Sequence, residues 1–435
     1  MSTIKNISAR RLWDSRGHPT IEVSVALDNG LTRRAMAPAG ASRGAREAHD
    51  LRDGGTSLGG RDVQRAIRAV NEVIAPALRG MSIADQAALD AKIISLDDSP
   101  LKEYLGGNAT VATSLAAIHA AAANAGKPLW RHIADEYQRT PLVPLPEIQI
   151  FGGGAHAGRR VDIQDFMIMV PGADSFEEVL EITSEIYFAA GDIMSQKGRL
   201  AGVADEGGWW PVFDNNEEAL ETLVRAIEKA GEKPGERVVI SLDIAASEFG
   251  KNGRYRLALD DRELNSAAFI DLLGNWLDAY PIASIEDPLG EDDVDGMVEF
   301  TRRYGDRVQI IGDDYVVTNA ALVEQSAREG ACNAVLIKVN QAGTLTEGVE
   351  TFQAAEKAGW RSVVSARSGE TEDVTISHLA TGLGAGQLKV GSFTRSERMA
   401  KWNECLRIQD ELGADTFVCG APLKATWWGE QNIGE

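Results

Sequence analysis

The chain has 435 residues and a mass of 46.8 kDa, with 44% apolar and 25% charged residues. This length predicts two domains, or one large barrel with an appended domain, and the composition is typical of folded globular proteins. The 65 acidic residues outnumber the 44 Lys and Arg residues, so the net charge of −21 argues against general binding to nucleic acids or anionic membranes. A local cationic pocket could still hold a small anionic substrate.

The sequence contains no apolar run of about 18 residues, so we expect no membrane-spanning helix. Residues 1–6 lack the charged and apolar regions of a signal peptide. The three cysteines, Cys332, Cys405 and Cys419, are widely separated and form neither a disulfide framework nor a zinc motif. We therefore expect buried free thiols and a cytoplasmic protein.

Residues 1–138 mix strand and helix patterns. Residues 20–27 alternate like a half-buried strand. The glycine-rich residues 37–44 predict a loop, and residues 62–136 are rich in Ala and Leu at helical spacing. Strands followed by helices predict a small α+β domain, and the proline-containing residues 141–146 would lead out of it.

Residues 139–435 show a repeated pattern in which a short β-branched run ends at a charged residue and a helical stretch follows. From Glu286 onward the spacings between these charged residues are 27, 25, 29 and 22 residues, about one strand and one helix each. The repeat predicts parallel strands joined by right-handed crossovers, most simply an eight-stranded α/β barrel. In such a barrel the strand ends meet on one face, which would bring together Asp243, Glu286, Asp313, Lys338, Arg367 and Lys389.

Three of these residues are carboxylates that would lie at neighbouring strand ends. Asp243, Glu286 and Asp313 would repel one another unless a cation lies between them, and ligation by oxygen atoms alone favours Mg²⁺ over zinc. Each acid alone could equally form a separate salt bridge or cap a helix. Because all three follow β-runs in register, we predict a Mg²⁺ site.

Two lysines follow later strands of the expected barrel. A lysine close to another cation has its ammonium form disfavoured, so the pKa of Lys338 or Lys389 would fall and that residue could act as a base. Either lysine could instead clamp a phosphate or carboxylate without transferring a proton. The two roles could also be divided between them.

An acid opposite the lysine base would complete an elimination site. Glu206 follows an apolar stretch and precedes the pair Gly207–Gly208, which we expect to expose it, and Asp165 follows the glycine-rich residues 151–158 that contain His156. Anti elimination of a β-hydroxyl needs one group to remove the α-proton and another to protonate the leaving hydroxyl. We predict catalytic roles for Glu206, Asp165 and His156, with Asp165 and His156 also contacting substrate, although a loop histidine could simply be solvated.

Seven ordered motifs make the chain resemble the enolase family over essentially its whole length. The resemblance implies an enolase-type α/β (TIM-like) barrel with the active site over residues 139–435, preceded by a smaller α+β domain over residues 1–138. Because several long motifs occur in the family's order, the resemblance is highly specific. The matching segments are residues 14–20, 241–249, 284–288, 312–314, 336–341, 367–373 and 395–398.

The resemblance also implies roles for individual residues. Lys338 would be the α-proton base, Lys389 would hold the substrate carboxylate, and Glu206 would serve the departing hydroxyl. Mg²⁺ would be bound by Asp243, Glu286 and Asp313, and the phosphoryl group by Arg367 and Ser368. Family members form dimers or larger rings, so we expect a homodimer or higher homo-oligomer, with Glu22 and Arg407 matching a salt bridge across the interface in relatives.

The chain departs from the family pattern near the expected site. Ala366 stands where the family has histidine, Ala39 where it has a serine that helps to hold a second Mg²⁺, and Asp165 where it has glutamate. Arg159 and Arg160 occupy a catalytic loop that tends to be uncharged in bacterial relatives, where they could contact an anion or face solvent. A misplacement of about 1 Å can cost roughly a hundredfold in rate, so these changes favour an altered substrate.

The sequence therefore predicts a Mg²⁺-dependent enolase-family lyase that forms a phosphoenolpyruvate-type product from a small phospho- or phosphono-carboxylate. The retained ligand and lysine positions, together with the altered positions, favour a specialised enzyme resembling the carboxyphosphonoenolpyruvate synthases of phosphinothricin-type antibiotic biosynthesis. The alternatives are an ordinary glycolytic enolase and a non-catalytic binding protein with an enolase fold.

Overall fold

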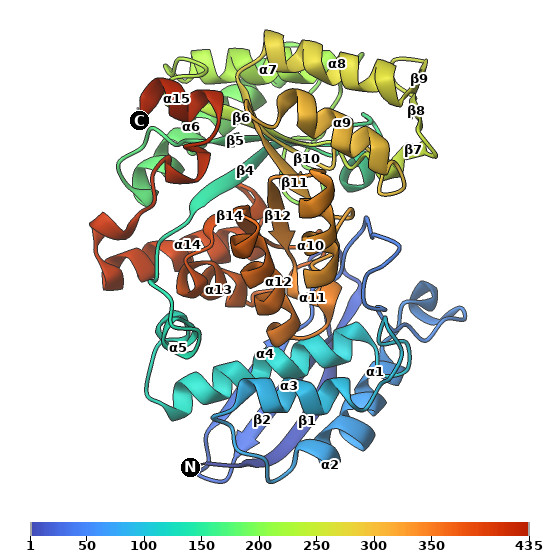
Figure 1. Ribbon diagram of the computed structural model, residues 1–435, viewed down its shortest axis with the longest axis vertical. Coiled ribbons are helices and arrows are strands. Elements are labelled where there is room, and N and C mark those ends of the chain that lie inside the picture. The colour runs from blue at the N-terminus through green and yellow to red at the C-terminus, as the bar shows by residue number, and fades with distance from the viewer. Residues whose placement is uncertain (1, 434–435) are drawn as a thin grey trace.

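The computed structural model describes residues 2–433, and its N-terminal part lies below a barrel in the view of Figure 1. A three-stranded antiparallel sheet is formed by β1 (Ile4–Trp13), β2 (Pro19–Leu27) and β3 (Thr32–Met36), with β2 in the centre. The expected strand over residues 20–27 exists, but it is almost wholly buried and not half-buried. The reason is that β2 has a strand on each side and is also packed against helix α4 (Gly107–Asn124).

The helices of this part occupy much of residues 62–136, as the Ala- and Leu-rich composition predicts. Helix α4 is the longest of them and is buried along most of its length, because it contacts both β2 and β3 and also α11 of the barrel. The other helical segments are α1 (Gln64–Arg68), a π-helical turn (Ala69–Ile74), α2 (Ala75–Leu78), α3 (Gln86–Ile94) and α5 (Leu129–Glu136).

Eight strands close into a barrel, which confirms the predicted fold class. In order around the barrel they are β4 (Leu145–Gly152), β5 (Asp165–Met169), β6 (Val239–Asp243), β10 (Ile282–Glu286), β11 (Gln309–Gly312), β12 (Ala334–Ile337), β13 (Arg361–Ser365) and β14 (Gly386–Ser392). The expectation that all strands are parallel is wrong, because β5 runs antiparallel to both β4 and β6. The β4–β5 connection holds only a single helical turn (Gly154–Ala157), whereas a parallel return needs a crossover of a dozen or more residues.

Helices surround the barrel, and several begin at a strong capping residue. They are α6 (Phe176–Gln196), α7 (Asn216–Lys229), α8 (Ser266–Ala279), α9 (Val294–Tyr304), α10 (Ala320–Glu329), α11 (Val339–Ala342), α12 (Leu345–Lys357), α13 (Thr375–Leu383), α14 (Ser396–Leu412) and α15 (Trp427–Asn432). Side chains that accept a hydrogen bond from the backbone N–H three positions on stabilise six of these helix starts: Ser175, Asn215, Asn265, Asp293, Asn319 and Thr344.

A small antiparallel sheet projects from the barrel between β6 and α8. It consists of β7 (Gly250–Lys251), β8 (Arg254–Leu257) and β9 (Arg262–Asn265). None of the helices within residues 2–433 is long and apolar enough to cross a lipid bilayer.

A layer of polar side chains lies inside the barrel. The Glu147 carboxylate is fully buried there and accepts hydrogen bonds from Gln387 Nε2 (2.8 Å) and Ser241 Oγ (3.1 Å). Burial raises the pKa of Glu147 to about 7, against the opposing effect of the nearby Lys389 ammonium. Glu147 therefore changes charge near neutral pH inside the folded protein.

We expect Glu147→Gln to change the pH dependence of stability. The folded pKa of about 7 lies above the ordinary value of 4.5, so the wild type loses stability as pH rises between these values and the loss is complete above pH 7. Glutamine has no such ionisation, so the variant should gain about 2–3 kcal/mol relative to wild type between pH 5 and 8. Denaturant unfolding at pH 5 and pH 8 measures the two free energies of unfolding, and the exposed Glu103→Gln serves as the control. The prediction would be contradicted if the difference in unfolding free energy between Glu147→Gln and wild type were the same at both pH values.

Candidate active site

The ends of the barrel strands bring the predicted residues to one face. Asp243 and Glu286 are the last residues of β6 and β10, while Asp313 and Lys338 directly follow β11 and β12. Asp165 is the first residue of β5 and pairs in register with Asp243, because β5 runs in the opposite direction. The reversed strand therefore adds a carboxylate to the same edge.

The ammonium group of Lys389, in β14, lies among three of these carboxylates. Its Nζ is 2.7 Å from Asp243 Oδ2, 2.8 Å from Glu286 Oε2 and 3.5 Å from Asp165 Oδ2. Burial disfavours the charged ammonium, but attraction to Asp243 and Glu286 raises the pKa of Lys389 well above its ordinary value. Asp243 and Glu286 thus form salt bridges, as the alternative expected, but they share one lysine and do not each have a separate one.

The chemistry of these groups fits a hard divalent cation. The Glu286 Oε1 atom is buried and has no hydrogen-bond partner within residues 2–433. Burial and the adjacent Asp243 charge raise the pKa of Glu286 well above its ordinary value. An unpartnered buried carboxylate oxygen beside further carboxylates is a suitable ligand for Mg²⁺, which would involve Asp243, Glu286 and Asp313.

A second group of carboxylates, which the sequence reasoning missed, supports the turn after β11. Ligand atoms of Asp287, Asp313 and Asp314 lie within 4.8 Å of one another and could hold a metal ion, as could those of His156, Asp165 and Glu206, whereas Asp243, Glu286 and Asp313 do not form such a group among residues 2–433. Asp287 accepts hydrogen bonds from the backbone N–H groups of Asp313 (2.9 Å) and Asp314 (2.7 Å). These contacts fix the backbone from which the Asp313 side chain projects.

Lys338 is paired with Asp313, which also accepts a hydrogen bond of 2.8 Å from Gln341 Nε2. Burial opposes the charged form of Lys338, but the Asp313 carboxylate raises the lysine pKa above its ordinary value. The expectation of lowered lysine pKa values is therefore wrong for the protein alone, because carboxylates and not cations dominate the surroundings of Lys338 and Lys389.

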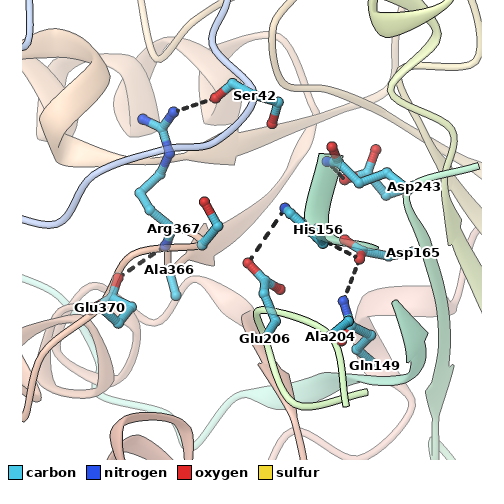
Figure 2. A network of polar contacts seen from close by, with 12 residues as sticks. Ser42, Gln149, His156, Asp165, Ala204, Glu206, Asp243, Ala366, Arg367 and Glu370 are labelled. Carbon is cyan, nitrogen blue, oxygen red and sulfur yellow. Dashed lines mark hydrogen bonds and ion pairs between the residues drawn. The ribbon is translucent and has the colours of Figure 1, made fainter. Parts of the chain in front are cut away.

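His156, Asp165 and Glu206 form a buried cluster (Figure 2). His156 Nδ1 is 3.0 Å from Asp165 Oδ1 and its Nε2 is 3.8 Å from Glu206 Oε1, while Gln149 donates a hydrogen bond to Asp165. Burial opposes a charged imidazole, but Glu206 and Asp165 raise the pKa of His156 to about 9. His156 is therefore a buried cation at neutral pH, and the alternative of a solvated loop histidine is wrong.

The expectation that glycines expose Glu206 is also wrong. Glu206 is only 6% exposed. The following glycines instead allow close packing: a Cβ on Gly207 would lie 2.6 Å from the Thr394 carbonyl oxygen, and one on Gly208 would lie 2.4 Å from Gln149 Oε1. The glycine pair therefore lets Glu206 lie inside the site.

The glycine-rich residues 37–44, here called the covering loop, lie over Arg367 (Figure 2). Arg367 Nη1 is 3.0 Å from Glu47 Oε2, and its Nη2 donates a hydrogen bond of 3.0 Å to the Ser42 carbonyl. A Cβ on Gly40 would lie 2.0 Å from Arg367 Nη2, so the arginine requires glycine there. Glu47 was not predicted from the sequence, although an acid just after the glycine-rich loop could have indicated a residue near the site.

A narrow cavity of about 20 Å³ connects most of these groups. Its lining includes Ala366 beside Arg367. Asp313 and Glu286 lie below this lining, in contact with lysines that reach it. The predicted site residues in the lining are His156, Asp165, Glu206, Asp243, Lys338, Arg367, Ser368 and Lys389.

The two loop arginines do not line this cavity within the described part of the chain. Arg159 is instead 69% exposed and forms an ion pair of 2.6 Å with Glu248, which supports the alternative of a solvent-facing loop. The proposed interface residues also have partners in their own chain: Glu22 lies 2.6 Å from Arg10, and Arg407 lies 2.7 Å from Glu404. Self-association remains a prediction.

The cysteines agree largely with the sequence analysis. Cys332 and Cys405 are buried free thiols, whereas Cys419 is partly exposed. Burial raises the pKa of the Cys405 thiol to about 12, so that thiol is unreactive at neutral pH.

Comparison with protein-family models matches both parts of the chain. Residues 4–133 match the model described as "Enolase, N-terminal domain", and residues 140–426 match "Enolase, C-terminal TIM barrel domain". The second match alone covers more than half of the 435 residues. The protein therefore belongs to the enolase family and is an enzyme of the enolase superfamily.

Proposed function

We propose that the protein is a Mg²⁺-dependent lyase that removes a proton next to a carboxylate and expels a β-hydroxyl, giving a phosphoenolpyruvate-type product. The observation that carries this proposal is a single cavity lined by Lys338, Lys389, Arg367 and the His156–Glu206 pair. A base, an acid and two cationic groups for a substrate's anionic ends are the groups that such an elimination requires.

Each residue has a defined task in this reaction. Lys338 takes the α-proton through its Nζ, and Lys389 and Arg367 hold the carboxylate and phosphoryl ends of the substrate. When bound, Mg²⁺ supplies positive charge beside the substrate carboxylate and so makes the neighbouring C–H more acidic. As the C=C bond forms and the C–O bond breaks, the proton of the His156 imidazolium passes by way of Glu206 to the leaving hydroxyl, which departs as water and leaves His156 neutral.

The space beside Ala366 supports a specialised substrate. Ala366 has a side chain of one carbon in the cavity lining, next to the guanidinium that would hold the phosphoryl group. We propose that the room left by alanine, where the family has histidine, is taken by a phosphono-carboxylate bulkier than 2-phosphoglycerate. We therefore propose a carboxyphosphonoenolpyruvate synthase of phosphinothricin-type antibiotic biosynthesis, in which Ala366 and Ala39 mark the altered end of the site.

An assay with Mg²⁺ and 2-phosphoglycerate tests this assignment. The wild type should turn over 2-phosphoglycerate slowly, and a substrate with a phosphono-carboxylate substituent should be preferred. Ala366→His should lower kcat/KM for the bulky substrate by at least about tenfold, because the imidazole would fill the space beside Arg367. The control Ala84→His places the same side chain on an exposed position of the N-terminal part.

Rapid turnover of 2-phosphoglycerate by the wild type would instead favour an ordinary glycolytic enolase. In that case the double change Ala366→His and Ala39→Ser should alter the rate by less than about threefold. If neither substrate reacts and Lys338→Ala preserves the biological role, the protein is a non-catalytic binding protein.

A further inference from the structure

A second, open hollow of about 670 Å³ is lined by residues 39–41 and 43 of the covering loop and shares Gly40 and Ala41 with the cavity described above. Five arginines and a histidine line it, whereas the carboxylates in its lining are Asp50 and Asp205. The hollow thus carries an excess of three positive charges on a chain whose net charge is −21. The cationic residues are Arg16, His18, Arg43, Arg52, Arg61 and Arg395.

Two of these arginines lack a carboxylate partner. Arg16, Arg43 and Arg52 are paired with Asp14 at 3.4 Å, Glu47 at 4.0 Å and Asp50 at 2.8 Å, whereas Arg61 and Arg395 have no carboxylate oxygen within 4.0 Å among residues 2–433. Arg61 contacts the His18 ring instead. Partial burial lowers the pKa of His18, and the positive charges of Arg61 and Arg16 lower it further. Within the described part of the chain, the arginines of the hollow whose positive charge is not paired are therefore Arg61 and Arg395.

We infer that this hollow binds a small, doubly charged oxyanion of the phosphate or phosphonate class. Guanidinium groups match the oxygens of such anions through paired N–H donors, and Arg43, Arg61 and Arg395 converge from three separate segments of the chain. The occupant is either free phosphate or the phosphoryl end of a second substrate molecule. This site is distinct from the one that Arg367 and Ser368 would provide.

The hollow is linked to the inner cavity through the covering loop. Gly40 and Ala41 line both spaces. Arg16 connects them as well, since its Nη2 donates a hydrogen bond of 2.9 Å to the Ala39 carbonyl and its Nη1 lies 3.2 Å from Ser368 Oγ. An anion bound by Arg16, Arg43 and Arg61 would hold the covering loop against the N-terminal part and so restrict its opening.

Calorimetric titration of the full chain with inorganic phosphate in Mg²⁺ buffer tests the site. We expect two phosphates per chain. The double variant Arg43→Ala/Arg61→Ala should weaken one of them by at least about tenfold, because each arginine contributes charge-assisted hydrogen bonds. Ser368→Ala should affect only the other phosphate, and the exposed Arg79→Ala should affect neither.

Hydrogen exchange provides a second readout that does not depend on activity. Phosphate should slow exchange of the amides in residues 37–44 in the wild type and not in the Arg43→Ala/Arg61→Ala variant. Competition with 2-phosphoglycerate identifies the occupant: displacement of the outer phosphate indicates a substrate phosphoryl group, and its retention indicates free phosphate. A single phosphate per chain that is insensitive to Arg43 and Arg61, in a variant that unfolds at the wild-type temperature, would overturn the proposal.

Discussion

Replacing Lys338 by alanine is expected to lower kcat by at least about a thousandfold, because a positioned general base contributes roughly 10²–10⁴ to the rate. Lys338 lies in the cavity lining and is paired with Asp313. Steady-state kinetics measure the loss. Exchange of the substrate α-hydrogen with solvent deuterium, followed by NMR, should disappear in the same variant.

Lys338→Ala also removes the ion-pair partner of Asp313. A loss of activity through unfolding must therefore be distinguished from a loss of activity through removal of the base. Lys338→Met retains a buried, unbranched side chain of similar length. In this variant Gln341 Nε2 can still donate its hydrogen bond of 2.8 Å to Asp313. Lys102→Ala is a matched control, because Lys102 forms another largely buried ion pair, at 2.8 Å from Glu347, outside the site. A folded Lys338→Met protein with exchange within about tenfold of wild type would show that another group takes the proton.

The barrel was predictable because its pattern is local. The barrel strands β10 to β13 are each a short, largely apolar run followed by a helix, so the period of the repeat can be read directly from the sequence. The reversed direction of β5 was not predicted, because it depends on how much of residues 153–164 becomes helical. That segment forms one helical turn and a loop, which returns the chain as a hairpin.

The residues of the candidate site could be predicted from the sequence only where they lie at or near the end of a barrel strand. Asp243, Glu286 and Lys389 converge because the closed barrel puts those ends on one face. The burial of Glu206 and the charge of His156 arise from packing between distant segments, such as Gly207 against Thr394, which no local pattern contains. The sequence pattern therefore predicts which of these residues lie close together more readily than it predicts their protonation states.

The outer hollow could not be predicted from the sequence either, because its residues come from distant parts of the chain. Its arginines are scattered from Arg16 to Arg395, and although Arg16 and Arg395 belong to two of the family motifs, no pattern in the sequence indicates that they share a space with Arg43, Arg52 and Arg61. Only the fold places the covering loop, the N-terminal part and the residues after β14 around a common space. Overall net charge is therefore a poor guide to the local potential that a substrate would meet.

Adding Mg²⁺ is expected to raise the unfolding temperature of the wild type, and Glu286→Gln should largely abolish this rise. A ligand that binds only the folded state at 100 times its dissociation constant adds about 2.7 kcal/mol to the free energy of unfolding. Glu286 is fully buried, and its Oε1 has no hydrogen-bond partner within residues 2–433. Removing its charge should weaken Mg²⁺ binding, because a neutral amide oxygen replaces a carboxylate.

The same substitution should stabilise the protein in EDTA. Burial and the Asp243 charge raise the pKa of Glu286 well above its ordinary value, which means that its ionised form is unfavourable in the fold without a cation. Glu286→Gln should therefore unfold at a higher temperature than wild type in EDTA and at a lower one in saturating Mg²⁺. This reversal distinguishes a metal ligand from a merely structural acid.

A matched buried acid outside the site supplies the control. Asp90 is also buried, and burial raises its pKa despite hydrogen bonds from Ser114 and Thr346. Asp90→Asn should change the unfolding temperature equally with and without Mg²⁺, because that residue lies away from the barrel face. If Glu286→Gln behaved like Asp90→Asn, the carboxylates at the ends of β6 and β10 would be held by Lys389 alone, and the assignment of a Mg²⁺ site to them would be wrong.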